Sequence, residues 1–310
     1  MHKRIYKIAT RQSPLALWQA NHIKEALIKR HPDIHIELLP MLTSGDQFLK
    51  DKLQSRGGKG LFVKELEEAL LDKRADFAVH STKDVPVTFP EGLTLAAICK
   101  RDNPLDAFIS HKYPNIDALP HQAVVGTASL RRQSQLLVHR PDLQIKTLRG
   151  NVNTRLEKLA SGEYDAIILA ASGLERIGLE HHIKQLIPTE IMLPACGQGA
   201  LSIECRADDT EVVTLIGELN DPLTASCVQA ERRVNELLGG NCHVPLAVYC
   251  LPSDTNTVTI DAKVLSFDGK QCISGSETGS VEEAMTLANK LGTYLLNQGA
   301  EQLLSLHDHE

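Results

Sequence analysis

Strand-like and helix-like segments alternate along the first 200 residues, in two successive rounds separated by the charged stretch 100–104. In the first round, strands are predicted at 4–10, 34–39, 76–80 and 93–99, and helices at 14–31 and 61–73. In the second round, strands are predicted at 123–126, 143–148 and 164–170, and helices at 130–139 and 152–160. Such alternation is typical of helices that cover both faces of a mainly parallel sheet. We therefore predict an α/β protein with two parallel-sheet lobes facing a cleft.

The residues after about 220 follow a different pattern. A helix is predicted from 222 to 238, where Gly239 and Gly240 end it. Strand-like runs at 246–251, 257–265 and 271–274 precede a long helix at 281–297. This order predicts a small α+β third domain.

Composition excludes several classes of protein. The net charge is −6 and aromatic residues make up only 4% of the 310 residues, which argues against binding to nucleic acid or to an anionic membrane. No apolar run approaches the roughly 20 residues that span a bilayer, and the N-terminus lacks the apolar segment of a secretory signal. The seven cysteines are odd in number and include no C-x-x-C pair, which favours free thiols in a reducing cytoplasm.

Basic residues are concentrated in the second lobe. Between residues 126 and 158, seven basic residues face only Asp142 and Glu157, so seven minus two gives a local charge of +5. The seven are Arg131, Arg132, Arg140, Lys146, Arg149, Arg155 and Lys158. Several lie where a strand leads into a helix, beside the hydroxyls of Thr127 and Ser129, and helix N-termini and arginines both bind anions well. This favours a site for a polyanionic ligand, with an ordinary solvated surface as the alternative.

Two segments of the first lobe occupy similar places. Arg11 and Ser13 stand between the first strand and the first helix, where Ser13 and Pro14 are typical of a helix start. Lys83 and Asp84 follow the strand at 76–80, and a carboxylate beside a lysine at a strand end is a candidate for catalysis. An aspartate that merely caps its turn is the commoner alternative.

Three other features bear on function. Gly57–Gly60 is no nucleotide-binding P-loop, because Lys59 is followed by Gly60 rather than Ser or Thr, and a mobile lid over residues 44–60 is predicted instead. The 13 histidines show no metal-ligand spacing, so no metal site is predicted. Cys242 follows a glycine-rich helix end and precedes His243, which indicates an accessible thiol suited to nucleophilic attack or attachment.

Taken together, these motifs resemble the hydroxymethylbilane synthase (porphobilinogen deaminase) family, in the family's order from residue 8 to 245. The matching stretches are 8–16, 58–67, 80–86, 126–132, 148–155, 197–200 and the Cys242 loop. The resemblance implies a monomer of three domains: 1–99 with 200–219, 100–199, and 220–310 carrying the cofactor cysteine. It also implies that four porphobilinogen molecules are condensed into the linear tetrapyrrole hydroxymethylbilane, with release of ammonia.

The resemblance further implies a role for individual residues. A dipyrromethane cofactor is expected on Cys242 through a thioether, and Asp84 matches the catalytic carboxylate. The residues expected to hold the acetate and propionate groups are Arg11, Ser13, Gln19, Lys83, Thr127, Ser129, Arg131, Arg132, Arg149, Arg155 and Arg176. Two departures affect the loops: Ser55 stands where many members carry lysine, and Asn241 interrupts the glycine pair before the cysteine.

This chemistry agrees with the residues. Loss of ammonia from porphobilinogen leaves a cationic azafulvene, and a carboxylate about 4 Å away contributes ~4 kcal/mol at an effective dielectric of about 20. That attraction is worth about three decades of rate if it exists only once the cation develops. A non-catalytic, two-lobed polycarboxylate-binding protein is the main alternative, but it has no need of Asp84, Cys242 or a third domain.

Overall fold

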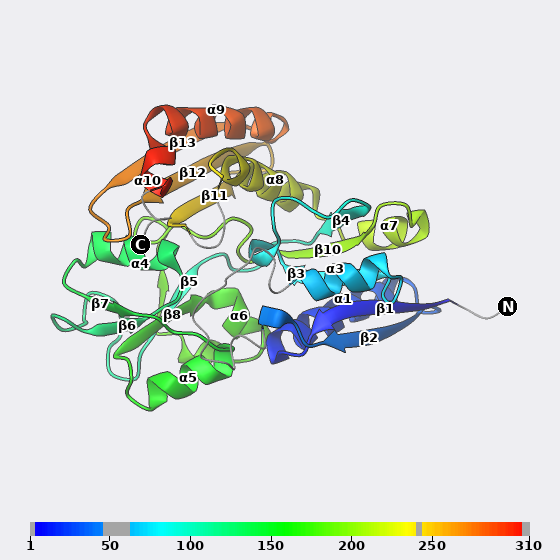
Figure 1. The fold of residues 1–310 in the computed structure, drawn as a ribbon, viewed down its shortest axis with the longest axis horizontal. Coiled ribbons are helices and arrows are strands. Elements are labelled where there is room, and N and C mark those ends of the chain that lie inside the picture. The colour runs from blue at the N-terminus through cyan, green and yellow to red at the C-terminus, as the bar shows by residue number, and fades with distance from the viewer. Residues whose placement is uncertain (1–3, 46–62, 240–243, 306–310) are drawn as a thin grey trace. The chain divides into compact units, whose positions relative to one another are not determined.

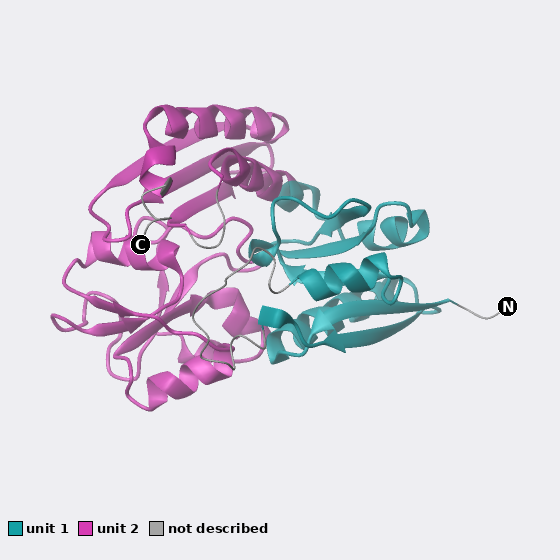
Figure 2. Cartoon of the chain, in the orientation of Figure 1, with its two compact units in different colours: residues 1–101, 200–225 teal, residues 102–199, 226–310 magenta. Residues whose placement is uncertain are grey.

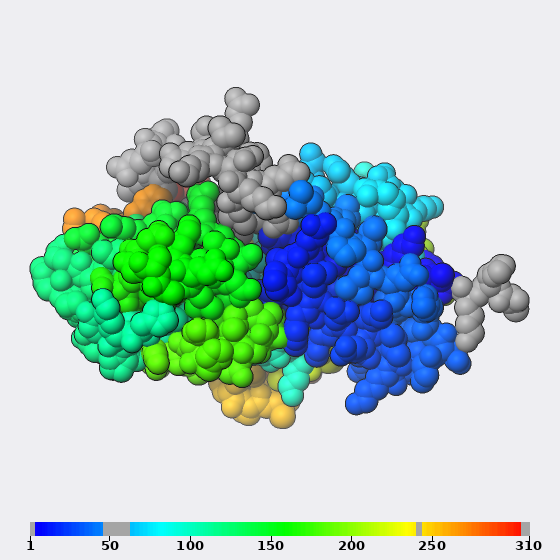
Figure 3. All heavy atoms as spheres, turned by 90° about the horizontal axis from the view of Figure 1, so that it is seen from below, coloured from blue at the N-terminus to red at the C-terminus, as the bar shows by residue number. Residues whose placement is uncertain are grey.

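The computed structural model describes residues 4–45, 63–239 and 244–305; the other residues are grey in Figure 3. The chain forms two compact units, residues 1–101 with 200–225 and residues 102–199 with 226–310 (Figure 2). Unit 1 is the first α/β lobe, and unit 2 contains the second α/β lobe and the small α+β third domain (Figure 1). The predicted fold class is thereby confirmed.

The first lobe is built on a five-stranded sheet in the order β2-β1-β3-β10-β4. Its strands are β1 (Ile5–Arg11), β2 (His35–Met41), β3 (Phe77–Ser81), β4 (Leu93–Ile98) and β10 (Leu201–Arg206). Strand β1 runs parallel to β2 and β3, whereas β10 is antiparallel to both β3 and β4. One strand therefore opposes the other four.

Helices cover both faces of this sheet. Helices α1 (Pro14–Arg30) and α7 (Thr210–Gly217) pack on one face, and α3 (Lys64–Leu71) packs on the other. Because successive side chains of a strand point to opposite faces, Phe77 and Val79 of β3 join the first core and Ala78 joins the second. The predicted start of α1 is correct, since the Ser13 side chain accepts a hydrogen bond from the Ala16 N–H.

The second lobe has the same strand plan, in the order β7-β6-β8-β5-β9. Its strands are β5 (Asp106–Ile109), β6 (Val124–Gly126), β7 (Gln144–Lys146), β8 (Ala166–Ala170) and β9 (Gln185–Ile187). Helix α4 (Leu130–His139) covers one face, and α5 (Val152–Ala160) and α6 (Ala171–Arg176) cover the other; a short helix, η2 (Glu180–His182), precedes β9. Here β5 is the antiparallel strand.

The strands β5, β9 and β10 are absent from the sequence prediction. All four residues of β5 and all six of β10 are buried, although each strand contains charged residues. A strand buried on both faces shows no alternation of polar and apolar residues, and interior charges disguise it further. The lobes are therefore mixed sheets rather than purely parallel ones.

The third domain consists of a three-stranded antiparallel sheet under helices. Strands β11 (Leu246–Pro252), β12 (Thr257–Leu265) and β13 (Cys272–Ser280) follow one another in space, and α8 (Pro222–Leu237), η3 (Val281–Glu283), α9 (Ala284–Asn297) and α10 (Ala300–Ser305) complete the fold. Strand β13 extends six residues beyond its predicted end at 274, because its second half is rich in Ser, Thr and Gly and lacks an apolar strand signal.

A buried carboxylate links the third domain to the second lobe within unit 2. Glu231 of α8 is 0% exposed. Its Oε2 accepts a hydrogen bond from the Gly197 N–H at 2.6 Å, and its Oε1 accepts one from the Cys250 N–H at 2.8 Å. Both carboxylate oxygens are therefore used, and the burial of this charge is compensated by charge-assisted hydrogen bonds.

Two general properties complete the description. Among the described residues, no helix is both long and apolar enough to cross a membrane. Six of the seven cysteines lie in the described ranges, and none of these six forms a disulfide bond.

The β12–β13 turn makes a close contact with α4, also within unit 2. Gly269 has a φ of +71°, and a Cβ added there would lie 2.8 Å from the Ser134 carbonyl oxygen and 2.9 Å from the Val138 nitrogen. Both are backbone atoms that cannot rotate away. Gly162 has a similar φ of +83° but nothing within 4 Å of its Cβ position.

We predict that Gly269→Ala destabilises the protein more than Gly162→Ala does. Each substitution forces alanine into the left-handed region at a cost of about 1–2 kcal/mol. Only Gly269→Ala adds a backbone clash, so its urea-unfolding midpoint will fall further. Equal losses in the two variants would mean that the turn does not depend on this contact.

Candidate functional site

The candidate residues of the first lobe lie at the carboxyl ends of β1 and β3. Arg11 is the last residue of β1, Ser13 caps α1, and the short helix η1 (Thr82–Asp84) follows β3 directly. Because β1 and β3 are parallel, these segments share one edge of the sheet. The sheet thus places Arg11, Ser13, Lys83 and Asp84 on the same edge, as the sequence predicts.

Hydrogen bonds to neighbouring segments hold the turn that carries Asp84. The Thr82 N–H donates to the Ala200 carbonyl at 3.1 Å, and the Thr82 and Ser202 hydroxyls are 2.6 Å apart. Gln19, which is buried, donates to the Ser81 hydroxyl at 2.8 Å. The Asp84 side chain itself is exposed and the Lys83 side chain is half-buried, so the carboxylate is accessible on a fixed support.

In the second lobe, Thr127 and Ser129 shape the start of α4. The Ser129 N–H donates to the Thr127 hydroxyl at 3.1 Å, and the Ser129 hydroxyl accepts from the Arg132 N–H at 3.4 Å. Thr127 is buried and Ser129 is half-buried. Both hydroxyls therefore build the helix N-terminus that the sequence predicts at this place.

The two arginines that follow are buried on one internal carboxylate. Arg131 Nη1 donates to Asp106 Oδ2 at 2.8 Å and to the Leu193 carbonyl at 2.6 Å. Arg132 Nε donates to Asp106 Oδ1 at 2.9 Å. Gln198 Nε2 adds a third donor to Asp106 at 3.0 Å. The side chains of Arg131 and Arg132 are thus held in place by a group that lies outside the basic segment.

Four other arginines of the second lobe fall into two groups. Arg176 is buried and paired with Asp102 at 2.8 Å, and Arg140 is paired with Asp142 at 2.7 Å. Arg149 is exposed, whereas Arg155 is half-buried and its Nε donates to the Gly150 carbonyl at 2.8 Å. The local charge of +5 counted for residues 126–158 does not include Asp106, which lies next to two of the seven basic groups.

Other predicted elements lie outside the described residues. These are Cys242, Asn241 and the predicted lid beyond its first two residues, including Ser55 and Gly57–Gly60. Sequence reasoning in turn missed Asp106, Asp102 and the buried pair His80–Glu204, whose side chains approach to 2.9 Å. An aspartate within the apolar run of residues 104–109 was the available signal for Asp106.

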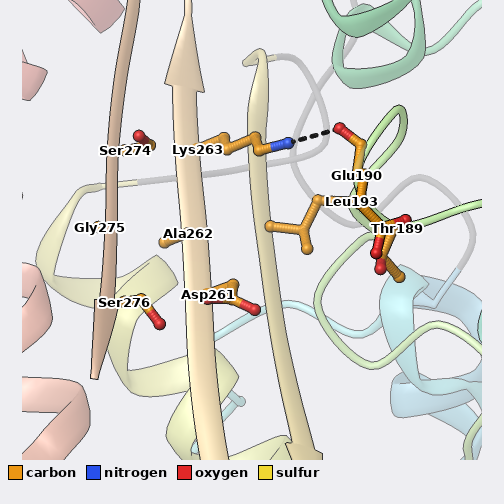
Figure 4. A pocket seen from close by; sticks show the side chains of 9 residues that line it. All are labelled: Thr189, Glu190, Leu193, Asp261, Ala262, Lys263, Ser274, Gly275 and Ser276. Atoms are coloured by element: carbon orange, nitrogen blue, oxygen red, sulfur yellow. Dashed lines mark hydrogen bonds between the residues drawn. The ribbon is translucent and has the colours of Figure 1, made fainter. Parts of the chain in front are cut away.

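A pocket of about 410 Å³ is present in unit 2. It is lined by Thr189, Glu190 and Leu193 of the second lobe and by residues of β12 and β13 (Figure 4). Lys263 crosses it to donate to the Glu190 carbonyl at 3.2 Å. No predicted site residue is among its lining residues. We therefore assign the candidate site to the carboxyl ends of the strands and not to this pocket.

Comparisons with known proteins agree with the motifs. Residues 6–214 match the family model described as "Porphobilinogen deaminase, dipyromethane cofactor binding domain", and residues 225–297 match "Porphobilinogen deaminase, C-terminal domain". The chain is 65% identical over 305 residues to the porphobilinogen deaminase of Legionella pneumophila strain Lens, covering 98% of this chain and 99% of that protein. It is 63% identical, with the same coverage, to the one from strain Philadelphia 1.

Among solved structures, the methionine-binding protein MetQ aligns with a TM-score of 0.45 and 14% identity, over 69% of this chain and 89% of that one. A putative methionine-binding lipoprotein from Bacillus subtilis aligns with a TM-score of 0.43 and 14% identity, with the same coverage.

We predict that Asp106→Asn is strongly destabilising. The variant leaves two buried guanidinium groups without their counter-charge, and breaking a buried ion pair in this way costs about 3–5 kcal/mol. Urea unfolding measures the loss, with Asp142→Asn as the control because its partner Arg140 reaches solvent. A loss at Asp106 no larger than that at Asp142 would contradict the anchoring role of Asp106.

Proposed function

Because the chain belongs to the porphobilinogen deaminase family, we propose that it joins four porphobilinogen molecules head to tail into the linear tetrapyrrole hydroxymethylbilane. Ammonia is released at each step. The near-full-length match to curated porphobilinogen deaminases carries this proposal. The enzyme is thus a transferase of tetrapyrrole biosynthesis, with porphobilinogen as its substrate.

The residues at the carboxyl ends of the strands suit a dipyrromethane cofactor. Its acetate and propionate groups are anionic, and the edge of the second lobe offers the N-termini of α4 and α5 together with the exposed Arg149 and the half-buried Arg155. When bound, the cofactor supplies the pyrrole carbon to which the first substrate is joined. We propose that Cys242 holds it through a thioether.

We propose that the anion-binding residues fall into two groups according to the exposure of their side chains. Arg11, Ser13, Lys83, Ser129, Arg149 and Arg155 are exposed or half-buried, and we assign them direct contact with ligand carboxylates. Gln19, Thr127, Arg131, Arg132 and Arg176 are buried. A ligand carboxylate that approaches Arg131, Arg132 or Arg176 competes with Asp106 or Asp102. We therefore propose that these arginines bind ligand carboxylates more weakly and also stabilise the loops at the strand ends.

Asp84 is proposed as the catalytic carboxylate. As the carbon–nitrogen bond of the porphobilinogen aminomethyl group breaks, positive charge develops on the pyrrole, and the Asp84 carboxylate stabilises it. The carboxylate also accepts hydrogen bonds from pyrrole N–H groups and so orients the attacking ring. The new carbon–carbon bond forms at the free α-carbon of that ring, whose hydrogen leaves as a proton.

The main alternative is a non-catalytic, two-lobed protein that binds a polycarboxylate. It predicts carboxylate binding without turnover of porphobilinogen and without a covalent adduct. Location in the cytoplasm and a monomeric state remain predictions from the sequence.

We predict that Asp84→Asn keeps the fold and the covalent cofactor but lowers kcat by about 1,000-fold, because the carboxylate's attraction to the developing cation is lost. Single-turnover and steady-state assays with porphobilinogen measure this. The matched control is Asp72→Asn, an exposed aspartate of the same lobe. Turnover like that of the wild type in Asp84→Asn would remove Asp84 from the mechanism.

We further predict that Cys242→Ser carries no covalent adduct after expression, because serine is a far weaker nucleophile than cysteine. The intact mass of the purified protein decides this. Cys272→Ser, which changes an exposed cysteine of β13, will keep the adduct. An adduct on Cys242→Ser, or none on the wild type, would overturn the attachment proposal.

A further inference from the structure

A group of buried ionisable side chains lies between α3 and the central strands of the first lobe. Within residues 4–45, 63–239 and 244–305, three buried side-chain oxygens have no hydrogen-bond partner, and all three belong to carboxyl groups. Two of them, Glu67 Oε1 and Glu204 Oε1, belong to side chains that influence one another electrostatically. Buried carboxylate oxygens without a partner are costly, so this pair requires an explanation.

A proton kept on Glu67 lowers the cost of burying the pair. Burial and the neighbouring Glu204 charge raise the pKa of Glu67 to about 7, against the opposing effect of His80. Glu67 can therefore stay protonated near neutral pH, because burial and the neighbouring negative charge both disfavour its charged form.

The other carboxylate oxygen of Glu204 contacts His80. The His80 Nε2 and Glu204 Oε2 atoms are 2.9 Å apart, and the two side chains are only 5% and 1% exposed. His80 is on β3 and Glu204 is on β10, and the two strands pair directly. This contact therefore links the antiparallel strand β10 to the strand that ends at the Asp84 turn.

Two other charged groups near the cluster are exposed or have partners of their own. Glu68 of α3 is exposed and weakly affects Glu67. Arg206, two residues beyond Glu204 on β10, donates to the Leu70 and Ala75 carbonyls and to Asp209. The balance of charge at Glu67 is thus set mainly by Glu204 and His80.

The same two strands support the turn that carries Asp84. Beyond His80 on β3, Thr82 bonds to the Ala200 carbonyl and to the Ser202 hydroxyl on the β10 side. The His80–Glu204 contact and the Thr82–Ser202 contact are therefore successive links between β3 and β10. A shift in the first link would be passed on to the second, which immediately precedes Lys83 and Asp84.

We propose that Glu67, His80 and Glu204 act as one buried positioning unit for Asp84, in which Glu67 keeps its proton and Glu204 fixes His80. This proposal rests on the proposed function for its link to Asp84. The retained proton does not depend on that function and can be tested separately.

The first test is the infrared spectrum of the full-length holoenzyme at pH 6 and pH 8.5. The wild type will show the carbonyl-stretch band of a protonated carboxyl at the lower pH, and the band will titrate near pH 7. Glu67→Gln will lose the band, whereas the matched control Glu68→Gln, an exposed neighbour on α3, will keep it. A wild type without the band, or an unchanged band in Glu67→Gln, would overturn the proton proposed on Glu67.

The second test separates positioning from simple stability. His80→Leu removes the donor to Glu204, and we expect kcat to fall about tenfold while KM stays within twofold, since small misplacements of a catalytic group are costly. His80→Gln keeps an amide donor, and we expect it to recover most of kcat. Equal kcat values in His80→Leu and the wild type, or no recovery in His80→Gln, would overturn the positioning role.

The proposal can still be tested if a variant fails to fold or if the enzyme shows no turnover. If His80→Leu does not fold, the dependence of kcat on pH is measured instead. We expect a step near pH 7 in the wild type and in Glu68→Gln, and no such step in Glu67→Gln. Identical profiles in the three proteins would overturn the proposal. If the wild type does not turn over porphobilinogen at all, the proposed function fails, and the infrared experiment still decides whether the proton is held.

Discussion

The carboxylate of Asp106 fixes the part of the second lobe from which the candidate site is built. It is 0% exposed and lies next to two guanidinium groups and one amide donor. A charge buried this deeply is tolerated only when it is surrounded by donors, and the donors in turn are confined to one geometry. Strand β5, the first turn of α4 and the segment around Gln198 are therefore locked to one another through a single side chain.

Each part of the molecule contains such an internal carboxylate. Glu204 serves the first lobe, Asp106 the second lobe and Glu231 the third domain, and all three receive donors from segments distant in the sequence. They differ in how fully they are satisfied. Asp106 and Glu231 use both oxygens, whereas Glu204 leaves one without a partner. The unsatisfied carboxylate is also the one whose strand supports the Asp84 turn.

Much of the fold could be predicted from local signals. Helices α4 and α5 and strand β12 begin and end at the predicted residues, because Ser129 and Asn151 cap the helices and Val258, Ile260, Ala262 and Val264 alternate with more exposed residues along the strand. Strands β5 and β10 could not be found in this way. Their interior positions include Asp106 and Glu204, whose partners are known only once the chain has folded.

The same limit applies to the candidate site. Sequence reasoning placed Arg11, Lys83, Asp84 and Arg149 at strand ends, where the structure has them, because strand and helix order alone determines that edge. It could not tell an exposed arginine from an internally paired one, since Arg131 and Arg149 look alike until Asp106 is placed beside Arg131. A chain of pyrroles gains two carboxylates with every ring added. Exposed arginines such as Arg149 can follow that increase by exchanging solvent for ligand, whereas Arg131 and Arg132 would first have to give up Asp106. The proposed division of labour thus follows from internal pairing: the exposed arginines are proposed to bind the growing anion, and Arg131 and Arg132 are proposed to hold the strand ends in place.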